Sequence, residues 1–586
     1  MNSVNLLYKD EFEDILEEIG SYHKFQRLLC WLIIYPACIP CGLHTYSQLF
    51  MAEVPKNYFC RLPDLISNIT HNNNSLALPL EEDGSVSKCR EYDIDLGTLS
   101  RLAAGEIERD PHWYTIPCLN GWEYDDSVQS SIVMDFDLVC QYDILPTVAL
   151  ATLNVGSLIG VALFGYISDW FGRLVGFWGS LGLTLIGGVA TAWTHSYTSF
   201  IIIRFILGLT TPANWQIPYV LGLEYVGPMK RTWYTIATCA SYTMGLIILA
   251  GLAYLIRDWR HLSYAVSLIM LPMFLGILHF DQQERLQHAQ ELMTEEKKHG
   301  KENGIATISQ NNLNMHTSHV NSVSPPAAVP SIPQRARNCF QIIHKRLRTV
   351  APAPKLFGLF LSPNMRKKTL LILLIWFANQ NVFVGLTYVG PQVGNSQYLG
   401  FFLTSAIELV SYIPCWLTMD HYGRRFPMII LMVVGGIFAC VTILLPKSHT
   451  VATMLCFLVA KMAVCASFLI IYPYAGELFP TELRAYGFSL GSYFGMMGLI
   501  VIPFIVYLGV DNLIIPIGVM GLMLVIGGLL TLLLPETLGT PLPQSIEEAE
   551  AFGKGWDWKT TLIGWQEKSA PKGFRRKARD SGAPLI

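Results

Sequence analysis

The sequence predicts an all-α membrane protein with twelve transmembrane helices, a fold class that rests on three observations. Only 15% of the 586 residues are charged and 52% are apolar, whereas a soluble globular chain has roughly 25% charged residues. Twelve apolar runs are each long enough to cross a bilayer core of about 30 Å as a helix. These runs form two sets of six around a long polar segment. Because lipid offers no partner to free backbone groups, such runs must be helical.

The twelve runs set the organisation of the chain, since a soluble helical protein would not contain so many of them. The first set is expected at 28–50, 144–168, 174–193, 198–221, 233–255 and 262–280. The second set is expected at 369–391, 397–419, 426–445, 450–475, 485–508 and 511–535. The predicted units are an N-terminal segment (1–27), a six-helix bundle (28–280), a linker (281–368), a second six-helix bundle (369–535) and a tail (536–586).

The loop between the first two helices, residues 51–143, carries the signals of an outer face. Four of the thirteen cysteines lie in it, outside any apolar run, at Cys60, Cys89, Cys118 and Cys140. They predict two disulfides in an oxidising compartment, with three connectivities open. The two Asn-x-Ser/Thr glycosylation sequons of the chain, at Asn68 and Asn73, lie in the same loop. We therefore expect a disulfide-bonded, glycosylated extracellular loop domain.

Charge gives the same orientation independently. The stretch from 282 to 368 contains thirteen Lys or Arg residues and five Asp or Glu residues, as expected for a cytoplasmic loop. The start of the chain is acidic and polar without a small-residue cleavage site, so the first helix is expected to be an uncleaved anchor. Both termini are then cytoplasmic, and the plasma membrane is the expected location.

A short motif follows the second helix of each set. It reads Asp169-x-x-Gly172-Arg173 in the first set and Asp420-x-x-Gly423-Arg424 in the second. Glycine permits a tight turn between helices, and Asp and Arg can form charge-assisted bonds across an interface. Repetition at matching positions argues against a chance glycine in a basic loop. The motif indicates two related halves with gating groups between helices.

Further motifs mark a particular family. The sequence has Cys118-Leu-Asn-Gly-Trp and Asp137-Leu-Val-Cys140 in the outer loop, Arg204-Phe-x-x-Gly208, Glu224 and Arg231 around the fourth helix, Asp258-Trp-Arg260, Ser362-Pro-Asn-Met-Arg366, Glu477-Leu-Phe-Pro-Thr-Glu-Leu-Arg484 and Leu534-Pro-Glu-Thr537. Over about residues 20–545 the chain resembles the organic cation/carnitine transporter family, solute carrier family 22 of the major facilitator superfamily. The resemblance implies two six-helix bundles that rock around a central site.

The chain departs from that family at three places, all on the cytoplasmic side. Trp170 and Leu174 stand where the first turn usually has basic residues, and Trp416 replaces the leading glycine of the second turn. Residues 280–285 replace the usual Pro-Glu-Ser-Pro-Arg run. These departures put the details of the cytoplasmic gate in question rather than the fold.

Two ionisable residues lie deep inside predicted helices. Glu408 and Lys461 are each about eleven residues from the outer end, which is roughly 16 Å at 1.5 Å per residue. Charged groups at that depth are costly and usually functional. They are interpreted either as a structural ion pair or as sensors of a charged solute, coupling ion or proton. Arg204 lies nearer the outer end, where a structural bond to another helix is expected.

Aromatic and amide side chains are the other candidates for solute contact, because ring faces attract ammonium groups. The family resemblance points to Trp215 and Phe383. Trp376 and Asn379 share a helix face with Phe383, although a helix–helix hydrogen-bond cluster is an equal explanation for the amides. Tyr242 and Asn154 are further candidates, and Tyr35, His44 and Tyr46 could either pack or line the path.

One position bears on the charge of the solute. Cation-transporting relatives often carry Asp, and anion transporters Arg, twelve residues after the motif arginine; this chain has Met496 there, counted from Arg484. With Glu408 and Lys461 both present, a carnitine-like, betaine-like or β-amino-acid zwitterion, or an amine, is the predicted solute. An organic anion or sugar carrier and a non-transporting receptor remain the alternatives.

Other classes are excluded by missing features. The sequence has no phosphate-binding Gly-x-x-x-x-Gly-Lys-Ser/Thr loop and no recognisable metal or nucleophile cluster. We expect neither an enzyme nor a cofactor, and the net charge of −3 without a basic block argues against nucleic acid. The expected partners are a small organic solute, the lipid bilayer and a coupling ion, proton or sodium, if transport is coupled.

Overall fold

The computed structural model describes residue 27, most of residues 29–271 and most of residues 358–553. The gaps inside these ranges are 62–77, 125–129, 227–230 and several shorter ones. Both predicted glycosylation sites, Asn68 and Asn73, and the linker from 281 to 357 therefore lie outside the described residues.

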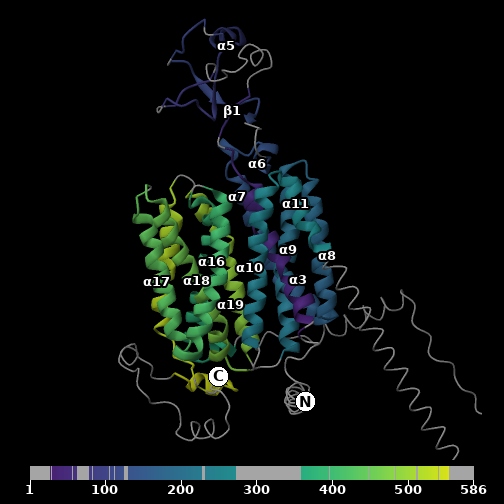
Figure 1. Cartoon of the computed structure of the whole chain (residues 1–586), viewed down its shortest axis with the longest axis vertical. Helices are drawn as coiled ribbons and strands as arrows, with labels where there is room; N and C mark the ends of the chain where they lie inside the picture. The colour runs from purple at the N-terminus through teal and green to yellow at the C-terminus, as the bar shows by residue number, and fades with distance from the viewer. Residues whose placement is uncertain are drawn as a thin grey trace, which may run out of the picture.

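Long helices form the body of the molecule, and a small domain of strands and short helices lies on one end of it (Figure 1). The first half contains the π-helical turn η1 (Cys30–Ile34) and helices α3 (Tyr35–Met51), α7 (Leu145–Phe171), α8 (Arg173–Ala192), α9 (Tyr197–Tyr225), α10 (Arg231–Leu255) and α11 (Trp259–Leu268). The second half contains α15 (Pro363–Val389), η5 (Gly390–Gln392), α16 (Gln397–Tyr422), α17 (Arg425–Leu444), α18 (Thr450–Leu478), α19 (Arg484–Leu499), α20 (Ile502–Tyr507), α21 (Ile514–Thr531) and α22 (Ile546–Ala551).

Ten helical segments within the described residues are long and apolar enough to cross a membrane. They include α7, α8, α9 and α10 of the first half and α15, α16, α17, α18, α21 and the α19–α20 segment of the second. The predicted first span is here η1 followed by α3. The predicted sixth span is described only in its first part, as α11.

The predicted eleventh helix, 485–508, is not continuous. It consists of α19 and α20, and Pro503 lies in the first turn of α20. Proline has no N–H to donate, so Pro503 cannot bond to the carbonyl oxygen of Leu499, four residues earlier, where α19 ends. The interruption was therefore visible in the sequence as Pro503.

The two Asp-x-x-Gly-Arg turns end α7 and α16 in the same way. Gly172 has φ of 99° and Gly423 has φ of 86°, both in the region that favours glycine. The following helices, α8 and α17, begin one or two residues later. The repeated sequence motif thus corresponds to a repeated backbone turn.

Small residues allow close packing inside the first half. A Cβ atom on Gly160 of α7 would lie 2.0 Å from the Leu209 carbonyl oxygen of α9, and one on Gly208 would lie 2.2 Å from the Leu153 carbonyl oxygen. Such approach between helix backbones is typical of membrane proteins, where packing rather than the hydrophobic effect drives association. The α7–α9 contact is accordingly the most extensive in the bundle.

The most extensive contacts between the two halves are made by α10 with α16 and by α7 with α19 and α20. At the latter contact the Asn154 side-chain amide donates to the Leu499 carbonyl oxygen at 2.7 Å. This bond accounts for Asn154, which the sequence left as a candidate for solute contact.

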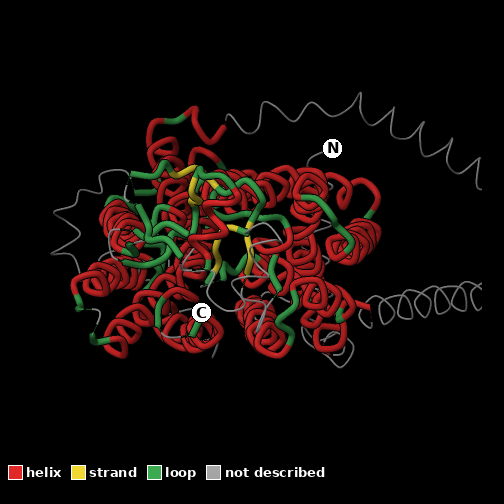
Figure 2. Tube along the Cα trace, turned by 90° about the horizontal axis from the view of Figure 1, so that it is seen from above, coloured by secondary structure: helices red, strands yellow, loops and turns green. Residues whose placement is uncertain are grey.

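The end of the bundle near Met51 and Leu145 carries the small domain, which we call the cap (residues 58–143). We call the opposite end of the bundle the tail end. Seen down the bundle, the cap strands project onto the helices rather than beside them (Figure 2). The cap has two antiparallel sheets, β1 (Tyr58–Cys60) with β4 (Trp122–Tyr124) and β2 (Arg90–Tyr92) with β3 (Thr115–Pro117), and helices α5 (Leu96–Ala103), α6 (Ile132–Asp135) and η3 (Cys140–Tyr142).

Two disulfides close the cap, as the sequence predicts. Of the three open connectivities, the structure has Cys60 with Cys118 and Cys89 with Cys140. The second bond joins Cys89, directly before β2, to Cys140 of η3, the last element of the cap before α7.

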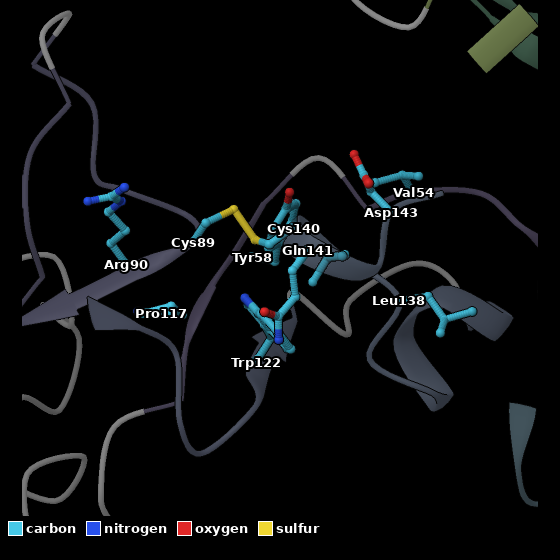
Figure 3. A pocket seen from close by; sticks show the side chains of 11 residues that line it. Val54, Tyr58, Cys89, Arg90, Pro117, Trp122, Leu138, Cys140, Gln141 and Asp143 are labelled. Carbon is cyan, nitrogen blue, oxygen red and sulfur yellow. A yellow bond between two sulfur atoms is a disulfide. The ribbon is translucent and has the colours of Figure 1, made fainter. Parts of the chain in front are cut away.

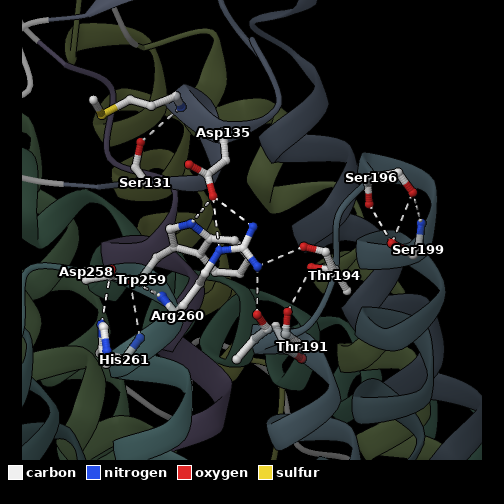
Figure 4. A network of polar contacts seen from close by, with 12 residues as sticks. Ser131, Asp135, Thr191, Thr194, Ser196, Ser199, Asp258, Trp259, Arg260 and His261 are labelled. Carbon is white, nitrogen blue, oxygen red and sulfur yellow. Dashed lines mark hydrogen bonds and ion pairs between the residues drawn. The ribbon is translucent and has the colours of Figure 1, made fainter.

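An arginine-centred network also fixes the cap to the first half (Figure 4). The Arg260 guanidinium forms an ion pair of 2.9 Å with Asp135 of α6 and donates to the carbonyl oxygens of Ala192 and Thr194 at 2.7 and 3.0 Å. The Trp259 indole donates to the same Asp135 carboxylate at 3.0 Å. The cap is thereby bound to α8 and α11 of the first half.

Candidate functional site

A buried ion pair lies in the middle of the second half. The Lys461 ammonium of α18 is 2.8 Å from the Glu408 carboxylate of α16, and their side chains are 0% and 1% exposed. Of the two interpretations left by the sequence, the structure contains the ion pair itself. Removing two charges from water costs several kcal/mol each, which only good geometry and further hydrogen bonds offset.

Lys461 has a complete set of partners. Its ammonium donates to the Phe383 carbonyl oxygen at 2.9 Å and to the Thr387 hydroxyl at 2.6 Å, both on α15. It also lies 3.9 Å from the centre of the Phe383 ring. A cation with a carboxylate, two further oxygens and a ring face around it is well compensated.

Glu408 connects the pair to the other half of the molecule. The Thr243 hydroxyl of α10 donates to the Glu408 carboxylate at 3.3 Å and lies 2.7 Å from the Tyr412 hydroxyl. Thr243 is fully buried, and Tyr242 precedes it on α10. The charges of one half are therefore in hydrogen-bond contact with a residue of the other.

A row of aromatic rings extends from Lys461 along α15 and α18. Phe383 stacks on Phe468 at 5.2 Å, Phe468 meets Tyr472 at 5.4 Å, and Tyr472 meets Trp376 at 4.9 Å between ring centres. Phe383, Phe468 and Tyr472 are half-buried, so their rings are partly accessible. Lys461, Phe468 and Tyr472 share a face at i, i+7 and i+11, a spacing by which the sequence alone could have revealed the last two.

Trp376 and Asn379 do not reach the ion pair in the contacts described. Trp376 is fully buried against Tyr472 and Phe488. The side-chain amide oxygen of Asn379 accepts a 2.5 Å hydrogen bond from the Ser467 hydroxyl of α18. The neighbouring Asn381 amide donates to the Gly495 carbonyl oxygen of α19 at 3.2 Å. The amide cluster thus joins helices, the second of the two explanations the sequence allowed.

Trp215 belongs to a separate aromatic row in the first half. Its ring stacks on Tyr219 at 4.9 Å, and Tyr219 stacks on Tyr234 at 6.0 Å, which in turn meets Tyr35 at 5.9 Å. Trp215 and Tyr219 are half-buried. Each half therefore presents partly accessible rings, from α9 and from α15 with α18.

The structure also describes the other residues that the sequence singled out. Met496 is half-buried on α19, directly after Gly495. His44 lies 3.2 Å from the Met270 sulfur, and Tyr46 packs on Tyr388 at 5.5 Å. Arg204 donates to the Met51 sulfur of α3 and lies over the Phe200 ring, so it bonds to a neighbouring helix as expected.

The residues predicted to gate the second half, where the structure describes their side chains, lie together at the tail end. The Glu536 carboxylate accepts from the backbone N–H groups of Arg424 and Arg425 at 3.0 and 3.1 Å and so caps α17. The Arg424 guanidinium lies 3.1 Å from the Glu477 carboxylate. Arg484 is half-buried nearby; burial lowers its pKa, and the Glu477 charge opposes that shift.

The first half has a simpler counterpart. Arg173 pairs with Asp169 at 2.5 Å and donates to the Ser168 hydroxyl at 3.2 Å. The side chains of Glu224, Arg231 and Asp420, also predicted to gate, lie outside the described residues. Sequence reasoning missed Glu536, although its Pro-Glu-Thr motif was noted.

The cap contains a pocket of about 440 Å³ that the sequence did not indicate. Its lining includes Val54, Tyr58, Trp122 and Asp143, with the Cys89–Cys140 disulfide in its wall (Figure 3). Within the described residues there is no group of three or more His, Cys, Asp or Glu side chains that could hold a metal.

Known proteins resemble this chain in sequence and in fold. The Major Facilitator Superfamily model matches residues 145–415, and the "Sugar (and other) transporter" model matches residues 334–549. The structure is similar to that of the E. coli xylose transporter XylE in its inward-open conformation, with a TM-score of 0.51. The match covers 89% of this chain and 99% of the transporter. At 15% identity, it is a likeness of fold alone.

Curated relatives are closer in sequence. The chain is 41% identical to the carcinine transporter of Drosophila melanogaster over 94% of this chain and 80% of the relative. It is 35% identical to the β-alanine transporter of the same organism, over 92% and 89%. It is 30% identical to solute carrier family 22 member 16 of Xenopus laevis, over 92% and 94%. The chain therefore belongs to the organic cation transporter family, solute carrier family 22, of the major facilitator superfamily, a family of membrane transporters rather than enzymes.

Proposed function

We propose that this protein carries small zwitterionic or cationic amine solutes across the plasma membrane by alternating access. The observation that carries the proposal is the buried Glu408–Lys461 pair, because it offers one charge of each sign in the middle of the bundle. Its link to Thr243 places it where the two halves meet. A solute ammonium can compete for Glu408, and a solute carboxylate can compete for Lys461.

The relatives support an amine solute. Two of them are named as transporters of carcinine and β-alanine. These compounds share a β-alanyl unit, whose primary ammonium is positively charged at neutral pH. The partly accessible rings of Phe383, Phe468 and Tyr472 suit such a group, because aromatic faces attract cations. Met496, half-buried on α19, carries no charge of either sign.

We further propose twelve spans with the cap outside and both termini inside. The first span consists of η1 and α3, and α11 is the described part of the sixth. Two disulfides in the cap suit an oxidising compartment, and the basic linker suits the cytoplasm. If Asn68 and Asn73 are glycosylated, glycosidase treatment of intact cells will shift the apparent mass, and the double Asn→Gln variant will not shift.

An uptake panel in expressing cells tests the proposed substrate class. We expect uptake of labelled β-alanine or carnitine and of an organic ammonium, and none of a dicarboxylate or hexose. The Glu408→Gln variant should lose most amine uptake while reaching the cell surface, and Glu106→Gln, an exposed cap carboxylate, should behave as wild type. Uptake of dicarboxylates without amines would refute the proposal, and a lack of all uptake would favour a receptor.

Uptake by the same cells also tests whether solute transport is coupled to an ion gradient. Uptake measured with and without a proton or sodium gradient separates an ion-coupled mechanism from facilitated diffusion. For a cationic solute, the membrane potential alone contributes about 2.3 kcal/mol per charge per 100 mV. An uptake rate that follows the potential and ignores both ion gradients identifies a uniporter.

A further inference from the structure

At the cap end, aromatic rings from both halves close the bundle. Phe50 of α3 stacks on Tyr398 of α16, with ring centres 5.7 Å apart and planes 4° apart, and meets the edge of Phe401 at 5.1 Å. Tyr254 of α10 meets Tyr398 at 5.8 Å. We call these residues, together with Glu53 and Gln397, the cap-end gate.

A carboxylate lies inside this gate. Glu53 comes two residues after the end of α3 and is half-buried. Its Oε2 accepts hydrogen bonds from the Gln397 side-chain amide and, at 3.5 Å, from the Tyr398 hydroxyl. Both donors are neutral side chains and both belong to α16, so residues of the second half hold this carboxylate of the first half in place.

Opening the gate changes the surroundings of Glu53. A solute can enter from the cap side only when α3 and α10 separate from α16. Glu53 then leaves Gln397 and Tyr398, and the Phe50 and Tyr398 ring faces separate from each other. A carboxylate beside newly exposed ring faces is a favourable site for an organic ammonium.

The cap pocket adjoins this position. It is lined by Val54, the residue after Glu53, and by Asp143, and the two lie together on one side of the pocket (Figure 3). Tyr58 and Trp122 contribute aromatic surface to the same lining. The pocket therefore repeats the combination of carboxylate and rings immediately outside the gate.

We propose that the cap-end gate and the adjoining cap pocket form an entry site that captures the ammonium group of the solute, with Glu53 as its anion. The inference rests on the proposed amine transport and adds a second site to it, distant from the Glu408–Lys461 pair. Closing of the gate returns Gln397 and Tyr398 to Glu53, which displaces the ammonium toward the middle of the bundle.

The gate also offers matched controls. Glu53→Gln keeps an acceptor for Gln397 and Tyr398 but removes the charge. Gln397→Ala removes the donor but keeps the charge. Arg257 is exposed and lies over the Tyr254 ring at 5.7 Å, so Arg257→Gln removes a charge of the opposite sign from the same region.

The test measures KM and maximal rate for a labelled organic ammonium added outside, with surface protein quantified. We expect Glu53→Gln to raise KM by about threefold to tenfold at a near-normal maximal rate, the loss typical of one partly exposed charge or cation–π contact. Gln397→Ala should lower KM, because it removes the donor that competes with the ammonium for Glu53, and Arg257→Gln should not raise KM.

Two outcomes overturn the inference while transport itself stands. One is an unchanged KM in Glu53→Gln. The other is the same rise of KM in Gln397→Ala, which would make Glu53 part of a closing contact and no more. Absence of amine uptake by the wild-type protein would instead overturn the proposed function, and this inference with it.

Discussion

At the scale of single residues, the groups that compensate each buried charge determine which substitutions the centre of this transporter tolerates. Lys461 has four groups around it, namely the Glu408 carboxylate, two oxygens of α15 and the Phe383 ring. Glu408 has fewer, the ammonium and the Thr243 hydroxyl. The carboxylate therefore depends on Lys461 more than Lys461 depends on it, and loss of the lysine should be the more damaging change.

Lys461→Met should destabilise the protein by about 3–5 kcal/mol, because it leaves a buried carboxylate without its cation. Adding Glu408→Gln removes both charges and should restore much of the folded protein, without restoring uptake of a zwitterion. Surface quantity, thermal unfolding in detergent and labelled uptake measure the three effects. If Lys461→Met unfolds at the wild-type temperature, the pair does not stabilise this conformation.

The sequence alone predicts only some of the residues at the centre of the bundle. Depth in the membrane identified Glu408 and Lys461, because position along a helix fixes depth. It could not identify Thr243, since contact between halves depends on how they are rotated. Trp376 and Phe383 share a helix face, yet one packs inside the second half and the other lies over Lys461. Neighbouring helices decide this difference, and a single sequence does not place them.

At the scale of helices, glycine turns at the tail end determine where α8 and α17 begin. Gly423 has φ of 86°, and a Cβ atom there would lie 2.7 Å from the Glu536 carboxylate. That carboxylate caps α17 through the N–H groups of Arg424 and Arg425. The turn and the cap of the next helix are therefore one structural unit.

Gly423→Ala should reduce both stability and transport, because alanine there has an unfavourable φ and collides with Glu536. We expect a loss of roughly 1–3 kcal/mol from the backbone conformation alone. Gly165→Ala is the matched control, since a Cβ atom at Gly165 meets nothing within 4 Å. Thermal unfolding and uptake compare the two. Equal behaviour of both variants would show that Glu536 does not constrain the turn.

Helix positions were more predictable than the breaks within them. Hydropathy and length placed the long apolar runs, because lipid enforces both. The division into α19 and α20 was missed although Pro503 marks it. The disulfide connectivity of the cap could not be predicted, because Cys60 meets Cys118 through the pairing of β1 with β4, and that pairing joins segments more than fifty residues apart.

At the scale of the whole molecule, the contacts between halves run from the middle of the bundle to its cap end. They include Thr243 with Glu408, Tyr46 with Phe401 and Phe50 with Tyr398. The structure therefore represents a carrier closed on the cap side. The cap itself is bound to the first half through Asp135 and Arg260, so it should move with that half while the gate opens against the second.

Cross-links test whether the cap moves with the first half while the gate opens against the second half. A flexible thiol-reactive cross-linker applied to Glu53→Cys/Gln397→Cys joins α3 to α16 and should stop uptake, because the gate can no longer open. The same reagent on Asp135→Cys/Arg260→Cys joins groups that move together, so the cross-linked protein should keep its uptake relative to the unreacted variant.

The wild-type chain treated in parallel accounts for reaction at its own cysteines, of which Cys440 is exposed. Reduction of a cleavable linker should recover uptake in the first variant. Continued uptake through a fully cross-linked gate would show that solute enters by another route.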